Sequence, residues 1–492
     1  MFPPPFTVPP DLIRVDVPNH PLAIVSSDYG STLEAIPTDV PWRYESIPQT
    51  DAFIGDVKPI ETFDALNVSE WHADGVLGAG VKIAVFDAEW YGIDTPSPEL
   101  EGIVSHDCFA SKSCELPIDT LQLRYTFERG SHGVACAEIV RDIAPEAEIH
   151  VVRVNGQTTL ENAVDWAIRN DIDFISMSLS FFGESFYDGT GPINRLMDKL
   201  AAANILMVTS AGNYADQHYM DSYADQNGNG LHEFEWGSEF IPIYFNQGSA
   251  RISVNWDEYN NCGRSDFDVF LWSRDAELVG KATRTQSREE DGCNPSESLR
   301  GAIAESDWYF LQVHRAGGTG NTRFRIYARN GEFYTPMPEG SIVDPGNHPS
   351  VFTVGAVRAD RYVFNDPEPF SSQGPTLDGL QKPNISGPDG LTTHAFGPIG
   401  FYGTSASTPA VTGALALLLS EDFSQSPSDA ADRLSEAAIW EDHPNQDNRF
   451  GAGRARLPRR QSKSGCGGGA ALILPFWLVA FRKFKFRSQS KK

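Results

Sequence analysis

Short apolar runs alternate with stretches of helical periodicity in two parts of this 492-residue chain. Strands that are apolar throughout are buried on both faces, as in a parallel sheet covered by helices. The pattern predicts an α/β domain with a parallel sheet flanked by helices. The expected strands are residues 81–86, 149–154, 174–179, 205–209 and 351–354, and the expected helices are residues 160–170 and 193–203.

From about residue 216 to residue 332 the periodicity is different. Apolar and polar residues alternate in short segments separated by Gly, Asn and Asp, which is the pattern of half-buried antiparallel strands. This part is predicted to be a β-sandwich domain inserted into the α/β domain. Its expected strands are residues 250–256, 267–272, 308–313 and 323–327.

These two patterns divide the chain into five parts. The first is a Pro-rich N-terminal extension in which no signal peptide can be recognised. The α/β domain follows in two pieces on either side of the insert, and the last part is a glycine-rich and basic tail. The predicted boundaries are 1–60, 61–215, 216–335, 336–458 and 459–492.

The C-terminal tail has three sections. Residues 465–469 are glycine-rich and include Cys466, residues 470–481 are wholly apolar, and residues 482–487 are mainly basic. The apolar section is shorter than the roughly 20 residues of a stable spanning helix. The tail is similar to the tripartite sorting tails of bacterial surface proteins, so we expect it to engage a membrane or a sorting machinery. Cys466 would then be a processing or attachment point; the alternative is an incidental free thiol.

Charge and cysteine content limit the partners and the compartment. Without residues 459–492 the chain has 30 basic and 66 acidic residues, a net charge of −36, which would repel nucleic acid and anionic membranes. Two local disulfides are expected, Cys108 with Cys114 and Cys262 with Cys293, and these would place the protein in an oxidising compartment. The alternative for the first pair is a metal site that also includes His106.

Three segments could supply the groups of nucleophilic acyl transfer. Asp87 ends an apolar strand, His132 begins a helical pattern, and Ser405 precedes an apolar helix that contains Pro409. Because Pro is favoured in the first turn of a helix, Ser405 is expected at or just before the helix N-terminus, where amides and the helix dipole favour an oxyanion. Asn213 closes another strand and could donate to the same oxyanion. Cys136, within the histidine helix, is expected to be a buried small hydrophobe.

Together these segments resemble the subtilisin family of serine peptidases, with Gly403-Thr-Ser-Ala-Ser-Thr-Pro409 as the most specific part. The triad order Asp, His, Ser is also that of the family. The resemblance implies a serine endopeptidase that forms an acyl-enzyme, with Ser405 as nucleophile, His132 as base and Asp87 as its orienting carboxylate. It also implies protein or peptide substrates, no cofactor for the chemistry, and structural calcium as a family expectation.

The family also implies a substrate-binding strand. Ser178, Leu179 and Ser180 resemble the segment that pairs with substrate backbone. The chain departs from the family where Ser180 replaces the usual Gly, ahead of the bulky Phe181 and Phe182. It departs again after Asp87, where Ala88 and Glu89 stand in place of Ser or Thr and Gly.

A loop near the start of the insert could hold calcium. Asp225, Asn227 and Asn229 offer oxygen atoms at alternate positions, as in a calcium loop, but Trp236 stands where a bidentate acid is usual. The alternative is a polar turn without metal.

Two rival functions are a catalytically inactive binding scaffold, and a serine hydrolase restricted to esters or to a narrow processing task. The expected location is extracellular or at a bacterial cell surface, with the C-terminal tail as the membrane anchor.

Overall fold

The computed structural model describes residues 36–37, 60–95, 98–123, 130–259, 264–286, 294–360, 362–440 and 447–460 of a chain that forms two compact units, 1–458 and 459–492. Most of the Pro-rich extension, the predicted pair Cys262 and Cys293, Cys466 and the apolar tail lie outside the described residues.

A seven-stranded parallel sheet forms the centre of the α/β part, in the order β18-β17-β7-β5-β2-β4-β3. The α/β fold class and the five strands expected there are confirmed, and β3 and β18 extend the sheet at its two edges. The strands are β2 (Lys82–Asp87), β3 (Val104–Asp107), β4 (Glu148–Arg153), β5 (Phe174–Met177), β7 (Leu206–Ser210), β17 (Phe352–Arg358) and β18 (Ile385–Asp389).

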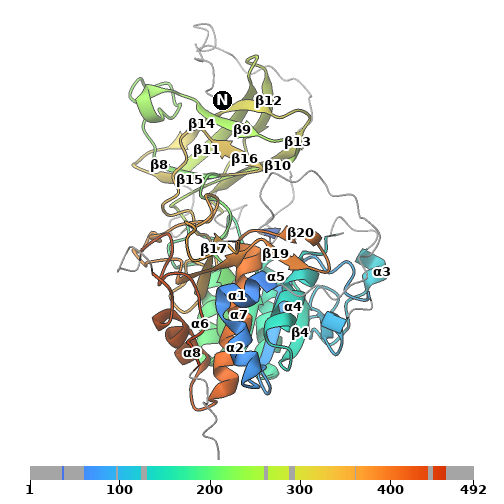
Figure 1. Ribbon diagram of the computed structural model, residues 1–492. Helices are drawn as coiled ribbons and strands as arrows, with labels where there is room; N and C mark the ends of the chain where they lie inside the picture. The colour runs from blue at the N-terminus through green and yellow to red at the C-terminus, as the bar shows by residue number, and fades with distance from the viewer. Residues whose placement is uncertain are drawn as a thin grey trace, which may run out of the picture. The chain divides into compact units, whose positions relative to one another are not determined.

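Helices cover both faces of this sheet because alternate residues of each strand point to opposite sides. In β2, Ile83 and Val85 pack with the helices α4 and α7, whereas Ala84 and Phe86 pack with α5 and α6. Helices α4 and α7 also pack against each other (Figure 1). The α-helices are α1 (Ile60–Leu66), α2 (Val68–Ala73), α3 (Thr120–Leu123), α4 (His132–Ile143), α5 (Gln157–Arg169), α6 (Pro192–Ala202), α7 (Thr404–Glu421) and α8 (Pro427–Glu436).

Short elements complete the α/β part. A two-stranded sheet pairs β1 with β6, and a hairpin pairs β19 with β20. They are β1 (Ile36–Pro37), β6 (Leu179–Ser180), β19 (Leu391–Thr393), β20 (Gly397–Phe401) and the 3-10 helix η2 (Pro98–Leu100).

All strands between residues 218 and 333 are antiparallel and form two further sheets, β13-β10-β15-β8 and β12-β11-β14-β9-β16. Their apolar faces share one core that contains Trp256, Phe267 and Phe324. The boundaries of a separate inserted domain stay a prediction. The elements are β8 (His218–Ser222), η3 (Glu235–Gly237), β9 (Ile241–Phe245), β10 (Gly248–Trp256), β11 (Ser265–Ser273), β12 (Leu278–Ala282), β13 (Ser296–Ile303), β14 (Asp307–Gly318), β15 (Arg323–Arg329) and β16 (Gly331–Phe333).

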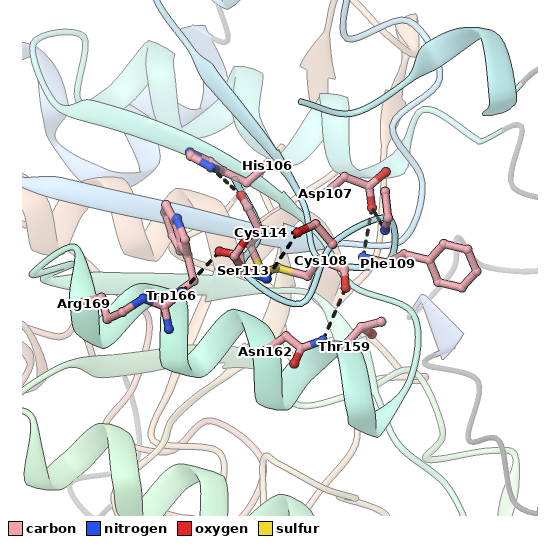
Figure 2. Close-up of a disulfide and its surroundings, with 12 residues drawn as sticks. His106, Asp107, Cys108, Phe109, Ser113, Cys114, Thr159, Asn162, Trp166 and Arg169 are labelled. Atoms are coloured by element: carbon pink, nitrogen blue, oxygen red, sulfur yellow. Dashed lines mark hydrogen bonds between the residues drawn. A yellow bond between two sulfur atoms is a disulfide. The ribbon is translucent and has the colours of Figure 1, made fainter. Parts of the chain in front are cut away.

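The loop after β3 is closed by a disulfide between Cys108 and Cys114 (Figure 2). This confirms the first expected pair, and the alternative metal site is wrong because both sulfur atoms are used in the bond. His106 instead lies against Cys114, with its Nδ1 atom 3.0 Å from the Cys114 carbonyl oxygen. Asn162 of α5 donates to the Cys108 carbonyl oxygen, which ties the loop to the helix below it.

Within the described ranges, no helix combines the length and the apolarity needed to cross a membrane.

Candidate active site

Asp107 and Asp87 are each the last residue of a strand of the parallel sheet, but their surroundings differ. Asp107, the last residue of β3, pairs with the Arg153 guanidinium at 3.1 Å and accepts N–H bonds from Phe109 and Ala110. It is a structural carboxylate that closes a turn. The carboxylate of Asp87, the last residue of β2, instead forms an ion pair with His132, the first residue of α4.

The Asp87 carboxylate holds His132 by its Nδ1 atom. Oδ2 of Asp87 lies 2.7 Å from Nδ1 of His132, and both side chains are buried. Oδ1 accepts the backbone N–H groups of Ala88 and Glu89, so the unusual residues after Asp87 still form the turn that fixes its carboxylate. Because the carboxylate can only accept, Nδ1 carries the proton and Nε2 is left as the basic nitrogen of the ring.

Glycine is required next to His132. A Cβ atom at Gly133 would lie 2.7 Å from the Asp87 Cβ atom, which is closer than two carbon atoms can approach. The Gly133 N–H also donates to the Glu89 carbonyl oxygen at 2.9 Å. The start of α4 can therefore approach the end of β2 only because residue 133 has no side chain.

Ser405 is the second residue of α7, as expected from the sequence, but Pro409 lies inside the helix and not in its first turn. Pro409 has no N–H to give to the Ser405 carbonyl oxygen four residues earlier. That oxygen accepts other donors: the Ser178 hydroxyl at 3.1 Å and the Cys136 thiol at 3.7 Å. Because Pro409 cannot donate to it, the Ser405 carbonyl oxygen can accept these two bonds, which tie Ser405 to α4 and to the segment before β6.

Asn213 is bonded to the residue that precedes Ser405. Its Oδ1 atom accepts the backbone N–H and the hydroxyl of Thr404, at 3.1 and 2.9 Å. Gly403, at φ 101°, lies beside the other end of the amide, where a Cβ atom would come within 2.8 Å of Nδ2. The side chain is therefore held against the N-terminus of α7 with its orientation fixed by Thr404.

Asp389, which sequence reasoning missed, supports this turn. It ends β18, is completely buried, and its Oδ2 atom accepts the Gly403 N–H at 3.0 Å. Burial, together with the Glu368 carboxylate, raises the pKa of Asp389 to about 8. The available signal was its position in a Pro-Asp-Gly turn that precedes the serine segment.

The segment predicted to bind substrate contains the short strand β6, which is paired with another strand. Leu179 and Ser180 pair antiparallel with β1, in the register Ile36 opposite Ser180 and Pro37 opposite Leu179. The following Phe181 N–H donates to the Asp344 carbonyl oxygen at 3.0 Å. The edge at β6 can thus hydrogen-bond an extended antiparallel chain.

Cys136 is buried, as expected, but its position was not foreseen. Its sulfur, a carboxylate oxygen of Asp87 and a ring nitrogen of His132 all lie within 4.8 Å of one another. Burial, together with the Asp87 charge, raises the pKa of the Cys136 thiol well above its usual range. Because the thiolate is the metal-binding form, this group of three does not suit a metal ion.

The calcium candidates form a closed polar turn. Asp225 accepts the backbone N–H groups of Gly228, Asn229 and Gly230, and Asn227 accepts that of Asn229. The side-chain amides of Asn227 and Asn229 donate to Glu239 at 2.9 and 2.7 Å. Their oxygens therefore accept hydrogen bonds from backbone N–H groups, and the calcium site at Asp225, Asn227 and Asn229 stays a prediction.

Comparison with known proteins agrees with this arrangement. Residues 78–234 and 295–453 match the model of the subtilase family. Subtilisin E of Bacillus subtilis (strain 168) is 27% identical over 154 residues, which cover 29% of this chain and 36% of that protein. Bacillopeptidase F of the same organism is 32% identical over 169 residues, which cover 32% of this chain and 11% of that one. The match thus spans 36% of the length of subtilisin E.

Among solved structures, the Clostridium perfringens CspB protease superposes with a TM-score of 0.55 at 16% identity, over 81% of this chain and 97% of that one. At this identity the likeness concerns the fold alone, and it confirms a subtilisin-like parallel sheet. The stretch between the two family matches, residues 235–294, contains strands β9 to β12 of the antiparallel sheets.

Proposed function

Because this chain belongs to the subtilase family, we propose that it is a serine endopeptidase that hydrolyses peptide bonds in proteins. The observation that carries the proposal is the 2.7 Å bond from the buried Asp87 carboxylate to His132 Nδ1, on a helix that packs against the helix of Ser405. A fixed carboxylate, an imidazole and a serine at a helix N-terminus are the groups that acyl transfer needs.

In the proposed mechanism, Ser405 Oγ attacks the scissile carbonyl carbon while His132 Nε2 takes the hydroxyl proton. Asp87 keeps Nδ1 protonated and stabilises the imidazolium that forms. The oxyanion is stabilised by the Asn213 side-chain NH2 group and the Ser405 backbone N–H. When the tetrahedral intermediate collapses, His132 gives its proton to the leaving amine, and an acyl-enzyme with Ser405 remains. Water, activated by His132, then releases the acid.

Substrate would bind as an extended strand along β6, through the backbone of Ser178, Leu179 and Ser180. The antiparallel pairing of β1 with β6 supports this proposal, since it is the geometry of strand addition. We propose that no cofactor takes part in the chemistry, because the four named groups provide the base, nucleophile and oxyanion donors.

We also propose that the protein acts in an oxidising, extracytoplasmic compartment. The Cys108–Cys114 disulfide supports this, because such bonds persist outside the reducing cytosol. Alkylation of free thiols in whole cells tests it: Cys108 and Cys114 should resist the reagent until a reductant is added. The proposal that the C-terminal tail engages a membrane or sorting machinery concerns residues outside the described part.

The test of the proposed activity compares the full-length chain with Ser405→Ala, using casein cleavage and a fluorophosphonate label. Ser420→Ala is the matched control, because Ser420 lies at the other end of α7 and bonds only to the Leu417 carbonyl oxygen among its recorded partners. Cleavage and labelling should both vanish in Ser405→Ala and persist in the control. Labelling without casein cleavage would favour a narrower substrate, and a folded wild type that does neither would favour the binding scaffold.

A further inference from the structure

Part of one face of the antiparallel sheet β13-β10-β15-β8 is buried although it points away from the apolar core. In β15, Phe324 and Ile326 point into the core. Arg325 and Tyr327 alternate with them and so lie on the opposite face, yet they are only 0% and 3% exposed. Asn255 stands opposite Arg325 in β10 and is 1% exposed. Since the second face of an antiparallel sheet is commonly solvated, another segment must cover this one.

The segment that covers this face follows the substrate strand β6. The rings of Phe182 and Tyr187 lie edge-on to Tyr327, with centroids 5.1 and 5.8 Å away. The Arg325 guanidinium lies 5.5 Å from the Tyr187 ring centroid. The side-chain amide of Asn255 donates to the Ser185 carbonyl oxygen at 2.9 Å. Residues 182–187 are therefore bound to the sheet by aromatic and polar contacts at several points.

The same aromatic cluster reaches the segment that contains Asn213. Tyr214, the next residue, packs edge-on against Tyr327 at 5.9 Å and against Phe182 at 5.1 Å. Its backbone N–H donates to the Ser372 hydroxyl at 3.1 Å. Tyr327 thus contacts two segments at once, one that leaves the substrate strand and one that leaves the oxyanion residue, and it belongs to neither.

We propose that Tyr327 is a positioning residue for substrate recognition, which fixes the wall formed by residues 182–187 relative to the substrate strand β6. The inference rests on the proposed peptidase function. Aromatic rings packed edge-to-face are held in narrow geometries, so the Tyr327 ring, which contacts Phe182, Tyr187 and Tyr214 together, helps to hold Phe182 in place beside β6. Without the Tyr327 ring, residues 182–187 shift into the vacated space. Extended substrates then lose contacts with this segment that they make both in the bound complex and in the transition state.

Contacts of this kind stabilise the bound substrate and the transition state equally, so their loss raises KM and leaves kcat nearly unchanged. We therefore expect Tyr327→Ala to raise the KM of the full-length chain for an extended peptide by about tenfold. Labelling by a small fluorophosphonate, which needs Ser405 and His132 but no extended site, should stay within about twofold of wild type. Tyr327→Phe should restore KM, because the ring makes the contacts with Phe182 and Tyr214. The hydroxyl takes part only in two long hydrogen bonds, from Arg325 Nη1 at 3.4 Å and to the Ser341 carbonyl oxygen at 3.5 Å.

Tyr244→Ala is the matched control. Tyr244 lies on β9 in the other antiparallel sheet, is half-buried, and packs against Trp308 away from residues 182–187. Its KM should equal that of wild type. The inference is overturned if Tyr327→Ala leaves KM unchanged, if Tyr244→Ala raises it equally, or if Tyr327→Phe loses as much as Tyr327→Ala.

A milder variant, Phe182→Leu, covers the case in which Tyr327→Ala does not fold. Leucine keeps an apolar side chain but removes the edge-to-face contacts with Tyr327 and Tyr214, so KM should rise about threefold with unchanged labelling. An unchanged KM would also overturn the inference. A folded wild type that takes no label would overturn the proposed function itself, and this inference with it.

Discussion

The parallel and the antiparallel sheets use their buried polar groups in different ways. In the parallel sheet, Asp87 and Asp389 end strands at the same edge and face residues of other elements, His132 and Gly403. In the antiparallel sheets, Glu258 accepts the Ser265 N–H and the hydroxyls of Ser265 and Thr322, which links the end of β10 to the starts of β11 and β15. Parallel strands bring their carboxyl ends to one edge, so Asp87 and Asp389 can hold residues of other elements there, whereas Glu258 only links strand ends of the antiparallel sheets to one another.

This comparison predicts the largest effect for Asp87→Asn, which should lower kcat by about 10⁴-fold because the amide no longer holds His132 in the productive tautomer. Asp107→Asn is the matched control at the end of β3, where the carboxylate pairs with Arg153. It should lower the free energy of unfolding and leave kcat within about threefold. Steady-state kinetics and urea unfolding of both variants measure these effects. Equal losses of kcat would contradict the assignment of Asp87 as catalytic and Asp107 as structural.

A smaller effect is expected for Asn213→Ala, which removes one donor to the oxyanion. Loss of a single donor typically costs about 10²–10³-fold in kcat, with KM little changed. Asn162→Ala removes a half-buried amide that bonds only to the Cys108 carbonyl oxygen among its recorded partners. Its kcat should match wild type. Peptide hydrolysis by the two variants at saturating substrate provides the measurement, and a kcat above half the wild-type value in Asn213→Ala would contradict the role of Asn213.

The raised pKa of Asp389 should make the free energy of unfolding depend on pH. Its pKa of about 8 in the folded chain, against an ordinary 3.8, means that the folded form binds the proton more tightly than the unfolded form. This stabilisation is complete below pH 3.8 and is lost as the pH rises through about 8. Burial is the main cause; the Gly403 N–H and Arg358 oppose it, and Glu368 and Asp360 add to it.

Asp389→Asn keeps an acceptor for the Gly403 N–H and does not titrate. Between pH 5 and pH 9 its free energy of unfolding should therefore fall less than that of wild type, by on the order of 4 kcal/mol. Urea unfolding at both pH values measures this difference. Asp432→Asn, which changes an exposed carboxylate on α8, serves as the control. An identical pH dependence in wild type and Asp389→Asn would show that Asp389 does not titrate as described.

The smallest effect is expected in the antiparallel region, for Asp225→Ala. This change removes the acceptor of three backbone N–H groups in an exposed turn, and should lower the free energy of unfolding by about 1 kcal/mol. Peptidase activity should not change. Because the turn satisfies its own oxygens, calcium should shift the melting temperature of wild type and variant equally. A calcium-dependent rise in wild type alone would support the calcium-site prediction.

Local sequence predicted much of this molecule because the relevant signals are short. The wholly apolar runs around Ile83 and Val208 identified parallel strands, and the alternation around Ile326 identified an antiparallel one. The short spacing of Cys108 and Cys114 indicated a local disulfide, which the structure contains. Edge strands such as β3 were missed because half-exposed residues interrupt the apolar pattern.

The sequence by itself determined the two sheet types and placed Asp87 at a strand end and His132 and Ser405 at helix starts, since periodicity and the special backbones of Gly and Pro act within a few residues. Only the tertiary structure decided that Ser178 and Cys136 bond to the carbonyl oxygen freed by Pro409, that Asp389 supports Gly403, and that Tyr327 packs on Phe182 and Tyr214. These contacts join residues far apart in the chain, and their geometry depends on how whole sheets and helices pack, which no local pattern records.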